Sequence, residues 1–76
     1  MPDYTIDVYR LQRKGKDGEL KTEIWAEIID EYTGLRMNRI LWWEDDEGIY
    51  HDATVDIPVE LRDLVDNAWI EKRRTF

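Results

Sequence analysis

Apolar and polar residues alternate most clearly between residues 49 and 57. Ile49, Ala53, Val55 and Ile57, with His51 in phase, occupy the odd positions, and more polar side chains occupy the even positions. A period of two is that of a strand with one face in the core and one face in water. The segment that starts at residue 4 alternates in the same way, so both segments are predicted to be strands.

Three glycine-containing segments divide the rest of the chain: residues 14–19 (KGKDGE), 30–35 (DEYTGL) and 44–49 (EDDEGI). In DEYTGL the glycine stands where a type I turn needs a following residue with positive φ, as in a hairpin. Regularly spaced turns of this kind are typical of antiparallel strands joined by short loops. We therefore expect four strands: Tyr4–Lys14, Leu20–Asp30, Leu35–Glu44 and Ile49–Ile57.

The apolar period changes after Pro58, which fits the first position of a helix. Apolar residues then recur three, four, seven and eight positions apart, which is one face of a helix: Leu61, Leu64, Val65, Ala68 and Trp69. Glu60 near the start and Lys72, Arg73 and Arg74 near the end suit the helix dipole. The pattern predicts an amphipathic helix over roughly residues 58–73.

Segment 20–32 fits two structures. Its apolar residues also form a helical stripe, and Gly34 is a plausible helix cap. Its β-branched content and the turn residues on both sides favour a strand. The expected fold is therefore α+β, a four-stranded antiparallel β-meander packed by one C-terminal amphipathic α-helix (β-β-β-β-α), with β-α-β-β-α as the alternative.

The sheet is predicted to be apolar on both faces in its middle, although one helix covers only one face. A three-residue loop after residue 31 would place Ile29 opposite Met37, Trp25 opposite Leu41 and Glu23 opposite Trp43. Trp42 and Trp43 must then lie on opposite faces. Either strong twist covers the second face, or another chain does, which makes a structural homodimer one hypothesis.

Composition bounds the functions that are open to the chain. It has 76 residues, which predicts one small domain (1–76), and it lacks cysteine, which excludes disulfides and thiolate zinc sites. Its 18 acidic and 11 basic residues give a net charge of −7, which argues against direct nucleic-acid or membrane binding. No signal peptide or membrane span is recognised, so we expect a cytoplasmic protein.

Catalytic chemistry finds little support in the sequence. Serine and cysteine are absent, and His51, the one histidine, is in phase with the apolar positions and is expected to be structural and to face the core. Asp45, Asp46 and Glu47 lack the ligand spacing of an EF-hand, so no metal site and no cofactor are predicted. Two basic clusters, Arg10 to Lys16 and Lys72 to Arg74, are not interleaved with aromatic residues in the sequence, as base stacking would require.

The chain resembles the small acidic inhibitors of phages and other mobile elements, such as anti-restriction and anti-CRISPR proteins, in size and charge only. The resemblance implies a nucleic-acid mimic that binds a basic protein. Our functional hypothesis is a non-enzymatic interaction protein, an inhibitor or adaptor with a basic-surfaced protein partner. The residues predicted to bind that partner are Trp43, Glu44, Asp45, Asp46, Glu47, Trp25 and Tyr50.

Overall fold

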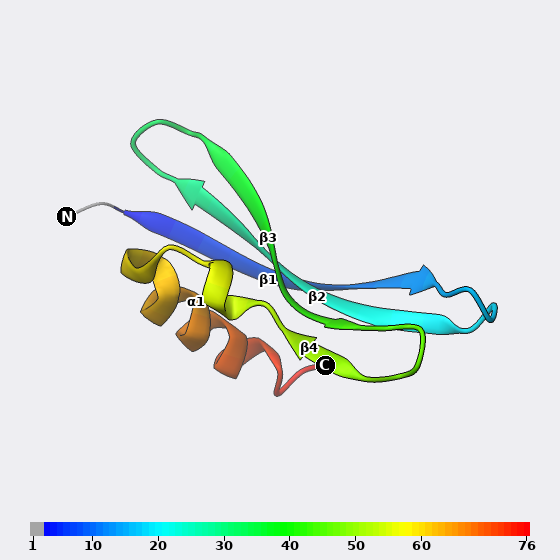
Figure 1. Cartoon of the computed structure of the whole chain (residues 1–76). Helices are drawn as coiled ribbons and strands as arrows, with labels where there is room; N and C mark the ends of the chain where they lie inside the picture. Colours follow the sequence, from blue (N-terminus) through cyan, green and yellow to red (C-terminus); the bar gives the residue numbers. More distant parts are fainter. Residues whose placement is uncertain (1–2) are drawn as a thin grey trace.

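Four strands form one antiparallel sheet in chain order, and a C-terminal helix packs against it (Figure 1). The computed structural model describes residues 3–76. Its elements are β1 (Tyr4–Lys14), β2 (Leu20–Asp30), β3 (Arg36–Glu44), β4 (Tyr50–Asp52), a 3₁₀ turn η1 (Thr54–Asp56) and α1 (Val59–Lys72). The predicted β-β-β-β-α order is confirmed, and segment 20–30 is a strand rather than a helix.

The three predicted turns connect the strands. Gly18, Gly34 and Gly48 have φ between 74° and 83°, a left-handed conformation that favours glycine. The first and third turns have the same pattern of hydrogen bonds: the N–H of Gly15 and of Asp45 donates to the carbonyl four residues later. The equivalent spacing of glycine in KGKDGE and EDDEGI therefore gives two similar hairpin turns.

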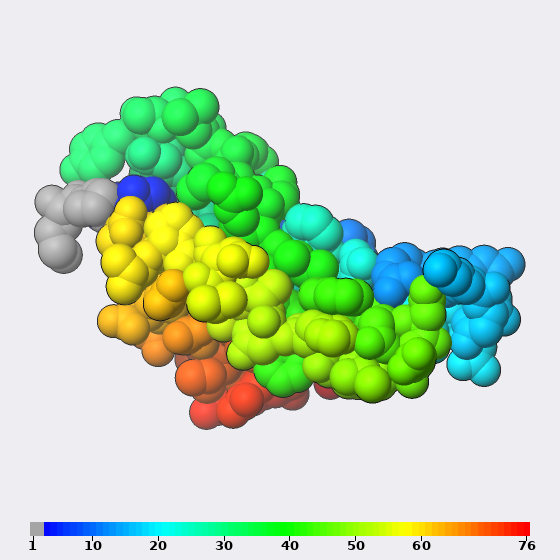
Figure 2. Space-filling model, in the orientation of Figure 1, coloured from blue at the N-terminus to red at the C-terminus, as the bar shows by residue number. Residues whose placement is uncertain are grey.

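The hairpin of β1 and β2 dominates the shape of the molecule. The two strands pair over eleven positions, from Tyr4 opposite Asp30 to Lys14 opposite Leu20. The molecule measures 46 × 23 × 21 Å along its principal axes. Figures 1 and 2 show that the helix covers one half of the sheet and that the β1–β2 turn and the β3–β4 turn project beyond it.

The core lies between α1 and the face of the sheet toward the helix. Its buried residues are Val8, Ile24, Ala26, Ile28, Leu41, Ile57, Leu61 and Val65. Tyr4, Ile6, Met37, Trp42, Ala68 and Trp69 pack around them. Even-numbered residues of β1 and β2 supply this face, as their alternation requires. The odd-numbered residues of these strands, including Trp25, therefore lie on the opposite face, which we call the far face.

The predicted register between β2 and β3 is only partly correct. Glu23 does lie opposite Trp43, but Trp25 lies opposite Ile40 and Ile29 opposite Arg36. The loop holds four residues instead of three, and a β-bulge then inserts Leu41 as an extra residue opposite the step between Ile24 and Trp25. Leu41 and Trp42 therefore both pack toward the helix, and Trp43 belongs to the far face.

β4 is much shorter than the predicted strand Ile49–Ile57. The carboxylate of Asp52 accepts hydrogen bonds from the N–H and the hydroxyl of Thr54, and the chain then turns into η1. Such local side-chain bonds compete with the ladder of a sheet. The predicted alternation of buried and exposed residues over 49–57 also fails, because Val55 is 69% exposed and, of these residues, only Ile57 is buried in the core.

The helix begins and ends within one residue of its predicted bounds. Leu61 and Val65 are buried, and Ala68 and Trp69 are half-buried against the core. Leu64, which we predicted on the same face, is 43% exposed. Within residues 3–76 no helix is long and apolar enough to cross a membrane.

Candidate functional site

The carboxylates of the EDDE turn serve mainly to build the turn. Asp45 accepts the N–H groups of Glu47 and Ile49, each at 2.9 Å, and its second oxygen lies 2.8 Å from His51 Nε2. The hydrogen bond with His51, followed by those of the backbone, lowers the pKa of Asp45 below its usual value. Asp45 therefore holds the turn closed rather than presenting a free charge.

Arg13 ties the same turn to the long hairpin. Its guanidinium lies 3.1 Å from Glu23 and 3.5 Å from Asp46, and it donates to the backbone carbonyl of Glu44 at 2.7 Å. The carboxylate of Glu44 accepts the N–H of Thr22 at 3.1 Å. Two of the predicted partner-binding residues, Glu44 and Asp46, are therefore committed to contacts inside the chain.

A second cation lies under the first hairpin turn. Lys21 is only 4% exposed, and its ammonium lies 3.7 Å from Asp17 and 3.9 Å from Glu19. The backbone N–H of Glu19 and the charge of Lys21 together hold the pKa of Asp17 below its usual value, with the hydrogen bond as the larger cause. The β1–β2 turn thus packs around Lys21, and the β3–β4 turn is held by Arg13.

The predicted aromatic residues separate onto two faces. Trp43 stacks on His51, with ring centroids 4.4 Å apart and planes 18° from parallel. His51 is exposed on the far face, so our prediction that it faces the core is wrong, because β4 pairs it directly with Trp43. Tyr50 lies on the other face and does not accompany Trp43.

Trp25 lies in the middle of the far face, between Tyr9 on β1 and Ile40 on β3. Its indole N–H donates to Glu23 at 3.1 Å, and the hydroxyl of Tyr9 donates to Asn38 at 2.7 Å. Burial and the nearby charges of Glu27 and Asp7 raise the pKa of Tyr9. The structure thus brings Trp25 and Trp43 to one face, but not Tyr50.

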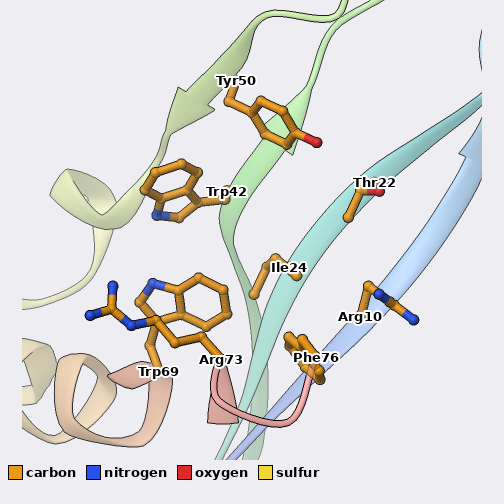
Figure 3. A pocket seen from close by; sticks show the side chains of 8 residues that line it. All are labelled: Arg10, Thr22, Ile24, Trp42, Tyr50, Trp69, Arg73 and Phe76. Atoms are coloured by element: carbon orange, nitrogen blue, oxygen red, sulfur yellow. The ribbon is translucent and has the colours of Figure 1, made fainter. Parts of the chain in front are cut away.

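Tyr50 instead lines a hollow that the sequence did not reveal. The hollow has a volume of about 390 Å³ and is lined by Arg10, Thr22, Ile24, Trp42, Tyr50, Trp69, Arg73 and Phe76. Figure 3 shows Trp42 and Tyr50 on one side, Trp69 and Phe76 on the other, and Ile24 and Thr22 from β2 between them. We call it the aromatic hollow.

Local structure explains how the aromatic hollow forms. The bulge in β3 turns Trp42 toward the helix, and Trp69 meets it from α1 with ring centroids 6.4 Å apart. Beyond α1 the hydroxyl and the N–H of Thr75 both donate to the carbonyl of Lys72, which brings Phe76 to 6.0 Å from Trp69. Arg10 from β1 then lies over the ring of Phe76 at 5.7 Å.

The structure also corrects one argument drawn from the sequence. Arg10 and Arg73 belong to the two basic clusters that are separate from aromatic residues along the chain. Folding places both arginines beside four aromatic rings. The sequence indicated one part of this hollow, because the helical period placed Trp69 on the face of the helix toward the sheet.

The outer face of α1 carries acidic side chains that remain available for a partner. Glu60, Asp63, Asp66 and Glu71 are exposed, and none forms an ion pair with another residue in the described part of the chain. Three exposed apolar side chains accompany them: Val59, Leu64 and Ile70. We call this surface the acidic helix face.

No three histidine, aspartate or glutamate side chains between residues 3 and 76 are grouped so that they would hold a metal ion. Comparison of the chain with protein-family models, with curated protein sequences and with solved structures finds no significant match.

Proposed function

We propose that the protein is a non-enzymatic interaction protein, an inhibitor or adaptor that binds a protein partner with a basic surface. The observation that supports this most is the acidic helix face, where four carboxylates that have no ion-pair partner within residues 3–76 accompany exposed apolar side chains. Unpaired surface charge raises the rate of encounter with an oppositely charged partner. The apolar side chains supply area that a partner can bury.

The surface that supports the proposal differs from the EDDE turn. Glu44, Asp45 and Asp46 bind groups of their own chain, whereas the carboxylate of Glu47 has no such contact with residues 3–76. Neutralising all four turn carboxylates would therefore disturb the turn itself. A change in partner binding would then not separate an effect of charge from an effect on folding. The carboxylates of the acidic helix face, in contrast, form no ion pair within residues 3–76.

The proposal is tested by neutralising the acidic helix face. A partner is first captured from a lysate of the source organism on immobilised protein and purified. Association is then compared for wild type and for a Glu60→Gln, Asp63→Asn, Asp66→Asn, Glu71→Gln variant at about 50 and 500 mM salt. We expect about tenfold slower association at low salt and a much flatter salt dependence.

A matched variant removes the same number of charges elsewhere: Asp3→Asn, Asp7→Asn, Glu31→Gln and Glu47→Gln. This control should retain most of the association rate if the acidic helix face is the docking surface. Equal association rates for both variants, or a captured partner whose binding does not depend on salt, would contradict the proposal.

A homodimer formed through the far face is the alternative to this proposal. Tyr9, Trp25, Ile40 and Trp43 form a half-buried apolar band there, and α1 packs on the opposite side of the sheet. The oligomeric state distinguishes this alternative from the proposal.

A further inference from the structure

We propose that the aromatic hollow binds a small planar aromatic anion, a ring system that carries a carboxylate or a phosphate. The volume of about 390 Å³ falls within the range of roughly 300–1,000 Å³ that is usual for small-molecule sites. Four aromatic rings and two arginines line this one site, and each of these features restricts the ligand.

The rings form a continuous curved wall. Tyr50, Trp42, Trp69 and Phe76 follow one another with ring centroids 6.0 to 6.4 Å apart, and successive planes are tilted by 40° to 54°. At these distances and tilts the rings contact each other, so a ligand cannot be inserted between them. A flat ring would lie along the wall, over Ile24, where offset and edge-to-face contacts with aromatic side chains are favourable.

The exposed ends of the wall leave aromatic surface for such a ligand. Tyr50 is 54% and Phe76 42% exposed, although each packs against a tryptophan that is itself half-buried. The two tryptophans are supported by the core, so the wall exists before any ligand arrives. A site that is already formed loses little conformational freedom on binding.

The charges at the hollow select an anion. Arg10 and Arg73 are exposed and form no ion pair within residues 3–76, whereas Arg13 and Arg36 each contact carboxylates. None of the eight lining side chains is acidic, although the chain has 18 acidic residues. Aromatic sites of similar composition bind ammonium groups when the surroundings are not positive, but two guanidiniums disfavour a cation here.

Both arginines line the hollow through long side chains. Figure 3 shows their guanidiniums on opposite sides of the hollow, at the ends of long side chains. Each guanidinium donates in a planar fork that matches a carboxylate or a phosphate. Both side chains are exposed, so each can reorient toward an anion that is bound at the hollow.

The ligand is tested with small probes that differ in charge. Adenosine monophosphate and indole-3-acetate are the anions, adenosine and indole-3-acetamide their neutral counterparts, and tryptamine the cation. Binding is followed by the indole N–H signals of the four tryptophans in NMR spectra. We expect Trp42 and Trp69 to shift saturably with at least one anion, with Kd below about 1 mM, while Trp25 and Trp43 stay unchanged.

The two anions separate the possible sources of the ligand, since one represents nucleotides and the other aromatic carboxylates. The preferred anion should bind at least about fivefold more tightly than its neutral counterpart, and tryptamine more weakly still. Absence of saturable shifts at Trp42 and Trp69 with both anions would overturn the proposal. Equal binding of anion and neutral counterpart, or tighter binding of tryptamine, would also overturn it.

Variants test the arginines directly. The Arg10→Gln, Arg73→Gln variant should lose the preference for the anion and bind the neutral probe as wild type does. The control Arg39→Gln, Arg74→Gln changes net charge equally at exposed arginines that do not line the hollow, and it should keep the affinity within about twofold. An equal loss of affinity for the anion in both variants would overturn the assignment of Arg10 and Arg73. The comparison of the probes on the wild-type protein does not depend on any variant.

Discussion

Asp45 illustrates how a single carboxylate organises one end of the sheet. One of its oxygens accepts two backbone N–H groups of the turn, and the other contacts His51. His51 in turn stacks on Trp43. The carboxylate thus fixes both the turn and the orientation of the stacked pair, so its protonation state affects more than its own hydrogen bonds.

We predict that Asp45→Asn lowers the melting temperature at neutral pH and that this difference shrinks in acid. The pKa of Asp45 is depressed in the folded chain, so its stabilisation is fully present above the unfolded value of about 3.9. It is lost as the pH falls through the lower, folded value. Thermal unfolding at pH 7 and at about pH 2.5 measures the effect.

Glu47→Gln is the control, because Glu47 lies in the same turn but its carboxylate forms no ion pair within the described residues. Its melting temperature should follow that of wild type at both pH values. A difference between Asp45→Asn and wild type that persists unchanged in acid would show that the carboxylate charge does not stabilise the turn.

Sequence reasoning at the level of residues was accurate where the physical cause is local. The turn glycines and the role of EDDE as a turn follow from backbone conformation and from carboxylates that accept nearby N–H groups. The sequence required only that Trp42 and Trp43 lie on opposite faces. Which of them faces the helix depends on the bulge at Leu41, and nothing in neighbouring residues indicates that bulge.

At the level of elements, the bulge in β3 decides what reaches the core. Leu41 is fully buried although it is the extra residue of the bulge, and it brings Trp42 onto the same side of the sheet. A regular strand would have placed only one of these residues there. The bulge therefore adds core volume and forms one side of the aromatic hollow.

We predict that Leu41→Ala destabilises the fold by about 2–5 kcal/mol, because the cavity it leaves is enclosed by the sheet and the helix. Leu35→Ala, at an exposed position just before the same strand, should change stability by less than about 0.5 kcal/mol. Urea unfolding followed by circular dichroism compares them. A small domain has little stability to lose, so Leu41→Ala is measured at low temperature. Similar midpoints for both variants would contradict this role of Leu41.

The boundaries of β1 and β2 were predicted correctly; glycine turns limit β2 on both sides and β1 at its C-terminal end. The length of β4 was not, since the bonds between Asp52 and Thr54 outweigh the alternation of residues 53–57. The register of β3 was not predicted either, because it depends on packing between strands rather than on any one segment. Local chemistry thus determined where strands end, and tertiary packing determined how they pair.

At the scale of the whole molecule, folding redistributes charge that appears clustered in the sequence. The acidic turn is partly neutralised by Arg13, while the acidic helix face keeps its carboxylates without ion pairs between residues 3 and 76. Arg10 and Arg73 meet at the aromatic hollow. One molecule therefore presents two surfaces of opposite charge.

We predict that the protein is a monomer at low micromolar concentration, with the far face exposed to solvent. Each side chain of its apolar band is already half-buried by its neighbours, so the band has little apolar surface left for a second copy to cover. Ion pairs of Arg36 with Glu27 and of Arg13 with Glu23 lie among these side chains and would have to be desolvated in a dimer. Sedimentation velocity between about 2 and 50 μM measures the state. A dimer would instead favour the homodimer hypothesis if Ile40→Lys dissociates it and the control Leu35→Lys, at an exposed position, leaves it intact.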